Sequence, residues 1–390
     1  MLDQLMAEIA ESIILDAGAA RAMKTRLDNP PEVAFSEAVR FAGAETGSST
    51  GWVSSFWKCN HGPGKLTPSE FFYYRLYDGH AEAGAAQRYV GKTMQEKMHR
   101  ACCDPMWFAP ALDKLTFLNL MQGAGIPVPH TEAVFNPSAK RMHPRLITSS
   151  EGLRGLFDRA GSYPLFAKPI DGMYSVGVLA ITDGDGDYVH IRGAGKVAVT
   201  DVATYMRDVT DAGYLLQNMM LPHVSIHDAF GPTLASVRML VLLGEDGPKI
   251  ESTVVKIPMP DNVADNYWRT GNMLGAVDTE TGKVLRAVTG TGRDLREAGT
   301  HPVTGTQLPG FQLPEWRVAT EMCKRAASTL PGLKTQSWDI ALTRKGPVAM
   351  EVNWGGDLNL HQLAHGRGIL TPSFIRHLRD NGYKGRLPNG

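Results

Sequence analysis

The chain has 390 residues, 43% of them hydrophobic and 21% charged, which excludes a disordered protein and allows two or three small domains with buried cores. Its 40 basic and 40 acidic residues give a formal net charge of zero, which disfavours nucleic-acid binding because such domains usually carry an excess of Lys and Arg. Its apolar runs stay well short of the roughly 20 residues that cross a bilayer. The acidic start and the four cysteines, which lack disulfide or metal spacing, predict a cytoplasmic protein without a membrane partner.

The amino-terminal region, residues 1–110, is predicted to be mostly helical, with Thr67 before a proline as one helix start. A further helix is expected after Asp113, which is a good N-cap residue, and its apolar side chains recur at helical spacing. Gly123 and Gly125 mark the end of this helix. Lys114 therefore lies in its first turn.

From residue 164 onward the pattern changes to short apolar runs separated by turn residues, which predicts strands and hairpins. Helices are expected among these strands at 198–211 and 315–330, the second with apolar residues along one face. Hairpins mixed with helices favour the α+β class over a regular parallel βαβ series. The expected strands are 164–170, 176–182, 188–192, 214–219, 236–243, 249–257, 273–278 and 283–288.

Near the carboxyl end, two strand-like runs at 337–343 and 347–353 are separated by a three-residue loop that ends in glycine, as hairpin loops often do. If the hairpin is symmetric about Lys345, Asp339 lies opposite Glu351. Asn353 then shares their face, because side chains two residues apart on a strand point to the same side. The other face is apolar and is predicted to enter the core; it carries Trp338, Ile340, Leu342, Val348, Met350 and Val352.

The opposed carboxylates indicate a cation. Two carboxylates about 4.5–5.5 Å apart repel each other unless they share a proton or a positive charge. The oxygens of Asp339, Glu351 and Asn353 suit Mg²⁺, which keeps waters and takes further oxygens from substrate phosphates. The alternative is a solvated hairpin face on which both acids are merely tolerated. The repulsion favours the metal site.

This part of the chain resembles a known family. A strand Asp followed by a Glu-x-Asn strand is similar to the metal-binding end of ATP-grasp enzymes. The segment 338–370, with Asn359-Leu360-His361-Gln362 and Gly366-Arg367-Gly368, is similar to the branch called sugar-transfer-associated ATP-grasp. The resemblance covers roughly residues 110–370, and the closing motif is its most specific part.

The resemblance implies an ATP-grasp fold, in which two α+β lobes clasp ATP. The first lobe, with a glycine-containing flap loop, is expected at 111–220 and the second, with the metal-binding hairpin, at 221–390. Two lysines and the flap would hold the phosphates, since nearly side-chain-free backbone can bring N–H groups close to them. A hinge after the strand at 214–219 would bind adenine. The residues implied in nucleotide binding are Lys114, Lys168, Gly172, Ser175, Gly177, Gln217 and Met219.

Further residues take roles in catalysis and substrate binding by the same resemblance. Arg238 is similar to the arginine that neutralises charge on the transferred phosphoryl group, and an arginine on an apolar strand needs a buried anion or an exposed edge. Lys256 is a second catalytic candidate. Asn272 is a candidate for substrate contact. His361 and Gln362 are two more, with plain packing as the alternative.

The implied reaction is ATP-dependent ligation of a small-molecule carboxylate to an amine through an acyl phosphate, on amino-acid-type substrates. ATP with Mg²⁺, or Mn²⁺, would be the cofactors. Phosphoryl transfer needs charge neutralisation and alignment more than a side-chain nucleophile, which the predicted residues can supply. A phosphotransferase and a non-catalytic ATP-binding accessory protein of polysaccharide or natural-product biosynthesis are the alternatives. A homodimer is compatible with this reading.

Overall fold

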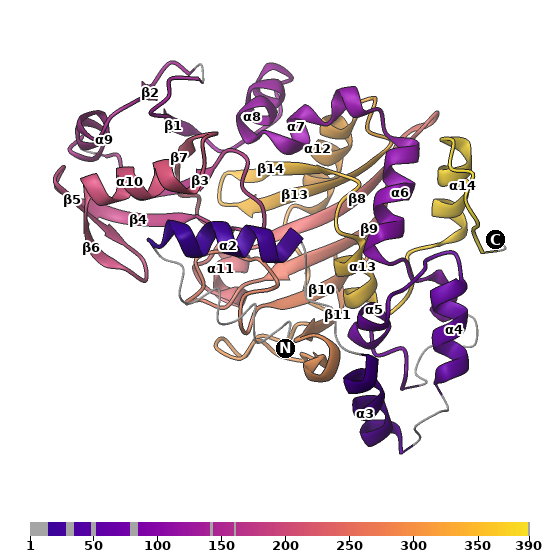
Figure 1. Cartoon of the computed structure of the whole chain (residues 1–390). Helices are drawn as coiled ribbons and strands as arrows, with labels where there is room; N and C mark the ends of the chain where they lie inside the picture. The colour runs from indigo at the N-terminus through magenta and orange to yellow at the C-terminus, as the bar shows by residue number, and fades with distance from the viewer. Residues whose placement is uncertain are drawn as a thin grey trace.

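The computed structural model describes residues 15–28, 35–47, 52–78, 85–140, 143–159 and 161–388. Its centre consists of two seven-stranded sheets that lie side by side, with helices packed around them (Figure 1). In the described part of the chain, the helices are too short and too polar to cross a membrane. The first 14 residues, whose acidic side chains contributed to the prediction of a cytoplasmic protein, lie outside the described residues.

The helices agree with the predicted starts where these could be read. Asp113 caps α8 by accepting a hydrogen bond from the Thr116 N–H, and Thr67 forms a reciprocal capping box with Glu70 at the start of α5. The helices are α2 (Ala17–Asp28), α3 (Phe35–Thr46), α4 (Val53–His61), α5 (Pro68–Tyr73), α6 (Lys92–Cys102), α7 (Ala109–Leu112), α8 (Lys114–Gly123), α9 (Ser150–Phe157), α10 (Val199–Val209), α11 (Val224–Phe230), α12 (Trp316–Ser328), α13 (Leu358–His365) and α14 (Pro372–Asp380).

Sheet A belongs to the first predicted lobe and has the strand order β2-β1-β7-β3-β4-β5-β6. All pairs are antiparallel except β1 with β2. The sequence pattern predicted β3, β4, β5 and β7 but missed β1, β2 and β6. The strands are β1 (Thr131–Phe135), β2 (Leu146–Ile147), β3 (Leu165–Pro169), β4 (Leu179–Gly184), β5 (Tyr188–Ile191), β6 (Gly195–Ala198) and β7 (Tyr214–Asn218).

Sheet B belongs to the second predicted lobe and has the order β12-β11-β10-β9-β8-β13-β14, entirely antiparallel. The hairpin β13–β14 therefore joins the sheet through β8, about 100 residues earlier in the chain. The strands are β8 (Ser236–Gly244), β9 (Gly247–Ile257), β10 (Met273–Val277), β11 (Val284–Thr289), β12 (Arg296–Glu297), β13 (Thr335–Thr343) and β14 (Gly346–Trp354).

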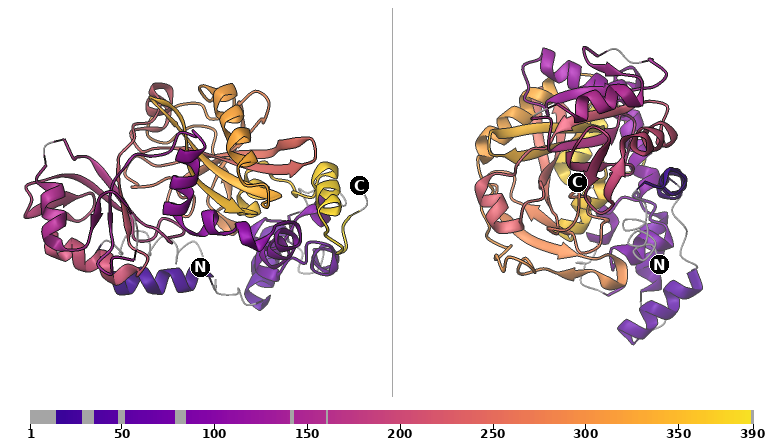
Figure 2. Two further views of the ribbon diagram at one scale, coloured as in Figure 1. Left: turned by 90° about the horizontal axis from the view of Figure 1, so that it is seen from above. Right: turned by 90° about the vertical axis from the view of Figure 1, so that its left-hand side faces the viewer.

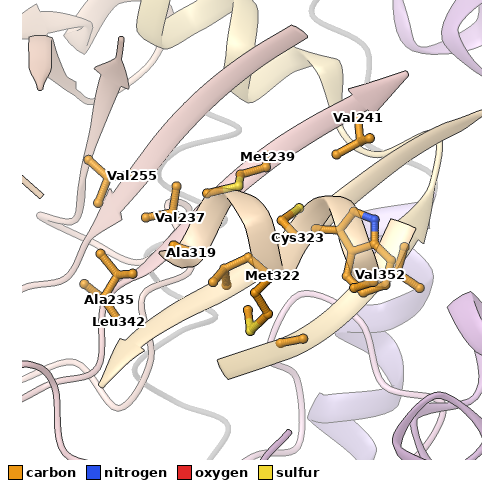
Figure 3. Close-up of a cluster of buried hydrophobic side chains, with 14 of the residues drawn as sticks. Ala235, Val237, Met239, Val241, Val255, Ala319, Met322, Cys323, Leu342 and Val352 are labelled. Carbon is orange, nitrogen blue, oxygen red and sulfur yellow. The ribbon is translucent and has the colours of Figure 1, made fainter. Parts of the chain in front are cut away.

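One face of sheet B is the hydrophobic core, covered by α12 (Figure 3). Val237, Met239 and Val241 alternate along β8 toward Ala319, Met322 and Cys323 of the helix, as strand and helix periodicities require. Burying a side chain of this size contributes about 1.5–3 kcal/mol. This layer therefore fixes which way every strand of the sheet faces.

The opposite face of sheet B is covered by α13 and by the amino-terminal helices (Figure 2). Aromatic residues of α4 and α5 pack there with Leu274 and Ala276 of β10. The strand residues that point to this side include polar ones, among them Arg238, Lys256 and Asp339. The fold thus places charged side chains between a sheet and a helical layer.

Candidate active site

The predicted hairpin forms, and Asp339 pairs directly with Glu351. The turn, however, is one residue shorter than predicted, because Thr343 pairs with Gly346 and not with Pro347. A β-bulge between Asp339 and Ile340 adds one residue on β14 and restores the predicted register. Two deviations thus cancel at the place where the carboxylates meet.

Because of the bulge, the residues of β14 that face the core differ from those predicted. Ala349 is fully buried and pairs with Ile340, whereas Met350 is only partly buried and lies outside the core cluster. Val348 is buried but also lies outside this cluster, while Val352 belongs to it as predicted. Strict alternation fails at Met350 because a bulged residue has no partner across the ladder.

Asp339 is held by two cations from neighbouring strands. It pairs with Arg238 of β8, whose Nε and NH2 atoms donate to the two carboxylate oxygens at 2.8 Å each. Lys256 of β9 donates to the same carboxylate at 3.0 Å. Asp339 is only 3% exposed, which excludes the alternative of a solvated hairpin face at this position. The buried anion that Arg238 requires is therefore Asp339.

Electrostatics hold this cluster fully charged. Burial alone would raise the pKa of Asp339, but Arg238 and Lys256 lower it well below its ordinary value. Burial would likewise lower the pKa of Arg238, and Asp339 raises it above its ordinary value. Burial would also lower the pKa of Lys256. The carboxylates of Asp265 and Asp339 outweigh burial and raise this pKa above its ordinary value. These groups form a compensated network, so the carboxylate repulsion predicted from the hairpin is relieved by protein cations.

Lys168 of β3 and Lys114 of α8 form a second pair of cations, in which the burial of Lys168 is not fully compensated. Lys168 of β3 is 8% exposed, and burial followed by the nearby Lys114 ammonium lowers its pKa from 10.5 to about 8. Glu351 and Asp339 act on Lys168 in the opposite direction, which shows that the two sheets face each other here. Lys114 lies 3.8 Å from Glu351. The structure thus brings together the predicted lysines and the predicted carboxylates.

The predicted flap follows β3 and contacts the same lysine. Lys114 donates to the carbonyl of Gly172. Tyr174 and Ser175 adopt positive φ angles of 56° and 57°, a conformation that costs about 1–2 kcal/mol per non-glycine residue. Gly177 also has a positive φ of 78°, and a side chain there would meet the Tyr214 hydroxyl at 2.9 Å. The loop is therefore a strained segment of the kind found at ligand-binding sites.

The donor set at the hairpin fits a magnesium ion. The residues described by the structure contain no cluster of three or more His, Cys, Asp or Glu side chains. Mg²⁺ does not need one, since it is usually bound by one or two carboxylates, waters and substrate phosphates. Asp339 and Glu351 supply the carboxylates. Asn353 lies on the same face, and its buried amide nitrogen has no hydrogen-bond acceptor within the described ranges. Metal binding by these three residues remains a prediction.

Two predicted substrate residues have their amides engaged in the protein. Asn272 accepts from the Met259 N–H at 2.7 Å and donates to the carbonyl of Asn266 at 2.7 Å, which organises loop 258–272. Gln362 accepts from the Val90 N–H at 2.7 Å and donates to the Tyr74 hydroxyl at 2.9 Å. These bonds support the packing alternative for Gln362 and leave substrate contact by either residue untested.

His361 of α13 has one ring nitrogen available. Its Nδ1 atom lies 2.9 Å from the Ser252 hydroxyl, and its buried Nε2 atom has no hydrogen-bond partner in the described part of the chain. Burial, followed by His365 and Arg238, lowers the pKa of His361 well below its ordinary value. A neutral imidazole beside Arg238 remains a candidate for substrate contact.

The predicted hinge lies at the end of β7. Gln217 is buried and donates to the Thr131 hydroxyl at 3.0 Å. The Met219 N–H donates to the Pro164 carbonyl at 3.0 Å, so an adenine contact by Met219 would use its own carbonyl. Binding of adenine at this position is a prediction that the contacts do not test.

Sequence reasoning missed two charged residues on loop 258–272. Asp265 accepts from the Ser236 N–H at 2.7 Å and lies 3.7 Å from Lys256, and Arg269 reaches the flap. Between two apolar strands, this long segment is unusually rich in polar and aromatic residues. That composition is typical of a functional loop and was the available signal.

A separate cavity of about 600 Å³ lies between α8 and the start of β1. Its Glu132 is paired with Arg145 at 2.7 Å and Arg159 at 2.6 Å. Lys114, Lys168 and Asp339 are not among the residues that line it. We therefore place the functional site at the facing charged groups of the two sheets.

Lysines of α8 and β3 lie near carboxylates of β13 and β14, an arrangement that can bind a polyanionic ligand between the two sheets. The family model described as sugar-transfer associated ATP-grasp matches residues 96–375, which is most of the chain, and the chain belongs to this family. Its fold is therefore the α+β ATP-grasp fold. Proteins with this fold generally use ATP and Mg²⁺.

Solved structures with a similar fold are distant in sequence. An L-amino acid ligase from Bacillus licheniformis is 13% identical, with a TM-score of 0.39, 72% of this chain covered and 49% of that chain. A D-alanine-D-alanine ligase from Coxiella burnetii is 13% identical, with a TM-score of 0.42 and coverages of 72% and 59%. A biotin carboxylase from Campylobacter jejuni is 11% identical, with a TM-score of 0.44 and coverages of 76% and 52%. The chain thus spans about half the length of these proteins. A search of curated proteins finds no match.

Proposed function

We propose that this protein is an ATP- and Mg²⁺-dependent carboxylate–amine ligase that forms an amide bond through an acyl phosphate, with amino-acid-type substrates. The observation that carries the proposal is the proximity of two lysines to two carboxylates. Lys114 of α8 and Lys168 of β3 lie near Asp339 of β13 and Glu351 of β14. Family membership supports ATP as the nucleotide. An amino sugar is a further candidate for the amine.

In the first step, an oxygen of the substrate carboxylate attacks the γ-phosphorus of ATP. The new O–P bond forms as the bond between the γ-phosphorus and the bridging oxygen breaks, and ADP leaves. Lys114 and Lys168 would neutralise the phosphate oxygens, and the flap backbone would exclude water from the acyl phosphate. Mg²⁺ held by Asp339, Glu351 and Asn353 would screen the charge of the β- and γ-phosphates.

In the second step, the amine nitrogen attacks the acyl carbon. The C–N bond forms, the C–O bond to phosphate breaks, the nitrogen loses a proton and inorganic phosphate leaves. Arg238 lies at the centre of the compensated network, where its charge can be shared between Asp339 and the departing phosphate. The chemistry needs no covalent bond to the protein.

A product assay tests the proposal against its alternatives. The protein is incubated with Mg·ATP and mixtures of amino acids and amino sugars, and ADP, free phosphate and coupled products are measured by enzymatic assay and mass detection. A ligase produces ADP and phosphate in equal amounts together with an amide. ADP with a phosphorylated product and no free phosphate would instead establish a phosphotransferase, and Mg·ATP binding without turnover an accessory protein. Absence of Mg·ATP binding would contradict all three.

A further inference from the structure

Loop 258–272, which joins β9 to β10, is a rigid platform beside the site. The Asn272 amide ties its two halves together through the bonds to Met259 and Asn266, and Asn262 donates to the same amide oxygen at 2.7 Å. Asp265 anchors the loop to Ser236 of β8. Because the ends and the middle are fixed, the direction of the side chains between them is fixed as well.

Arg269 on this loop is a cation without a matching anion. Its Nε atom is buried and has no hydrogen-bond partner among the described residues, and its Nη2 atom donates to the Ser175 carbonyl at 3.5 Å. Burial alone lowers the pKa of Arg269, and among the described residues no carboxylate offsets this effect. Burial penalises a charged guanidinium, and an oxyanion of a ligand that pairs with it would offset this penalty.

Two other arginines, Arg238 and Arg286, are paired with carboxylates. Arg238 forms two bonds of 2.8 Å to Asp339, and Arg286 lies 2.8 Å from Glu297. A guanidinium presents a rigid fork of donors that matches a carboxylate or phosphate. Arg269 has the same donors and lacks the acceptor.

The position of Arg269 relates it to the flap and not to the central charges. Arg269 reaches Ser175, and Asn266 of the same loop donates to the Tyr174 carbonyl at 2.6 Å. Lys114 holds the other part of the flap, at Gly172. The pKa of Lys168 responds to Lys114, Asp339 and Glu351, whereas that of Arg269 responds to burial alone. Arg269 thus contacts the flap from loop 258–272, a different element from those that carry the lysines and carboxylates expected to hold the nucleotide phosphates.

We propose that Arg269 binds an oxyanion of the substrate, a carboxylate or a phosphate group other than those of the nucleotide, beneath the flap. Arg269 is then a specificity-determining residue, and the protein selects a substrate that carries a second negative group in addition to its reacting carboxylate. This inference rests on the proposed function for the nature of the substrate. The anion subsite itself can be tested without turnover.

The test uses inorganic phosphate and acetate as separate probes on the whole chain, in the presence of saturating Mg·ADP and at constant ionic strength. Binding of each probe is measured from the rise in thermal unfolding temperature with concentration, since a ligand that binds only the folded state stabilises it. We expect wild-type protein to bind at least one probe, and the probe that binds identifies the class of oxyanion. Arg269→Gln should bind this probe at least tenfold more weakly, while its affinity for Mg·ADP stays within twofold of wild type.

Two further variants make the result decisive. Arg269→Lys keeps the charge without the fork and should recover part of the affinity. Arg207→Gln removes an exposed arginine of α10 that pairs with Asp208 and should bind the probe as wild type does. Because Arg269 is an uncompensated cation, Arg269→Gln should unfold at the same temperature as wild type or higher when no ligand is present. A lower unfolding temperature would indicate a structural residue and overturn the inference.

Unchanged probe binding by Arg269→Gln, failure of wild type to bind either probe, or a tenfold loss of Mg·ADP affinity would each overturn the inference. The last result would assign Arg269 to the nucleotide. If wild type does not bind Mg·ADP at all, the proposed function fails, and the same probe titrations without nucleotide still test Arg269. The two failures are therefore distinguishable.

Discussion

Lys168 and Lys256 are both buried lysines on central strands, one in each sheet, and their electrostatic environments are opposite. The pKa of Lys168 is lowered to about 8 by burial and by Lys114, whereas Asp265 and Asp339 raise that of Lys256 above its ordinary value. Lys256 has its counter-ions inside the protein. Lys168 is short of negative charge, which phosphates would supply.

The comparison distinguishes charged side chains that have counter-ions inside the protein, such as Lys256, from those that would pair with a ligand, such as Lys168. Compensated charges should matter for stability, because removing one partner leaves the others buried without a counter-ion. Uncompensated charges should matter for binding and cost the free protein stability. Substitutions on the two sides should therefore affect different measurements.

The largest effect is expected from Asp339→Asn. This change leaves Arg238 and Lys256 buried without a carboxylate, so the free energy of unfolding should fall by about 3–5 kcal/mol. Urea denaturation monitored by circular dichroism measures it. Asp183→Asn, an exposed residue near the end of β4, is the matched control and should change little. If the free energy of unfolding of Asp339→Asn decreases by less than about 1 kcal/mol, the charges of the network are not compensated as described.

The second prediction concerns Lys168→Met. Loss of a charged donor to the phosphates should weaken Mg·ADP binding by about 1.5–3 kcal/mol, or roughly 10- to 100-fold, measured by calorimetry. Because burial penalises the Lys168 ammonium, the free energy of unfolding should not fall. Loss of stability together with unchanged affinity would reverse the comparison between the two lysines.

The pH dependence of the same residue follows from its pKa. Lys168 in the free protein loses its proton as pH rises through about 8, and bound phosphates would favour the protonated form. Mg·ADP affinity should therefore fall above pH 8, by up to about tenfold per pH unit. Lys168→Arg keeps its charge and should show no such fall. A wild-type affinity that is flat from pH 7 to 9.5 would contradict the assigned role.

The sequence was sufficient for the pairing of Asp339 with Glu351 because a hairpin is local. The bulge at Met350 could not be predicted, because the apolar pattern of β14 gives no sign of it. The predicted three-residue loop and the unpredicted bulge compensated each other by one residue. A correct register was thus reached through an incorrect turn.

The charge network could not be predicted, because it depends on strand order. Arg238, Asp339 and Lys256 meet only because β8 lies between β9 and β13, and sequence patterns give no order for strands so far apart. For the same reason the counter-ion of Arg238 was left open. The hydrogen bonds of Asn272 and Gln362 could not be predicted either, because their partners lie on a loop and on a segment distant in sequence, and substrate contact by these residues stays a prediction.

The smallest stability effect is expected from Glu351→Gln, and it isolates metal binding from folding. The Glu351 side chain is 33% exposed and lies 3.8 Å from Lys114, so the free energy of unfolding should change by only about 0–1 kcal/mol. Asp339→Asn cannot test the metal site in this way, because it also disrupts the network with Arg238 and Lys256. If Asp339, Glu351 and Asn353 hold Mg²⁺, the Mg²⁺ concentration required for half-maximal ADP binding should rise at least tenfold in Glu351→Gln. Calorimetric titration of ADP at a series of Mg²⁺ concentrations measures this, and the same Mg²⁺ requirement in variant and wild type would exclude Glu351 as a ligand.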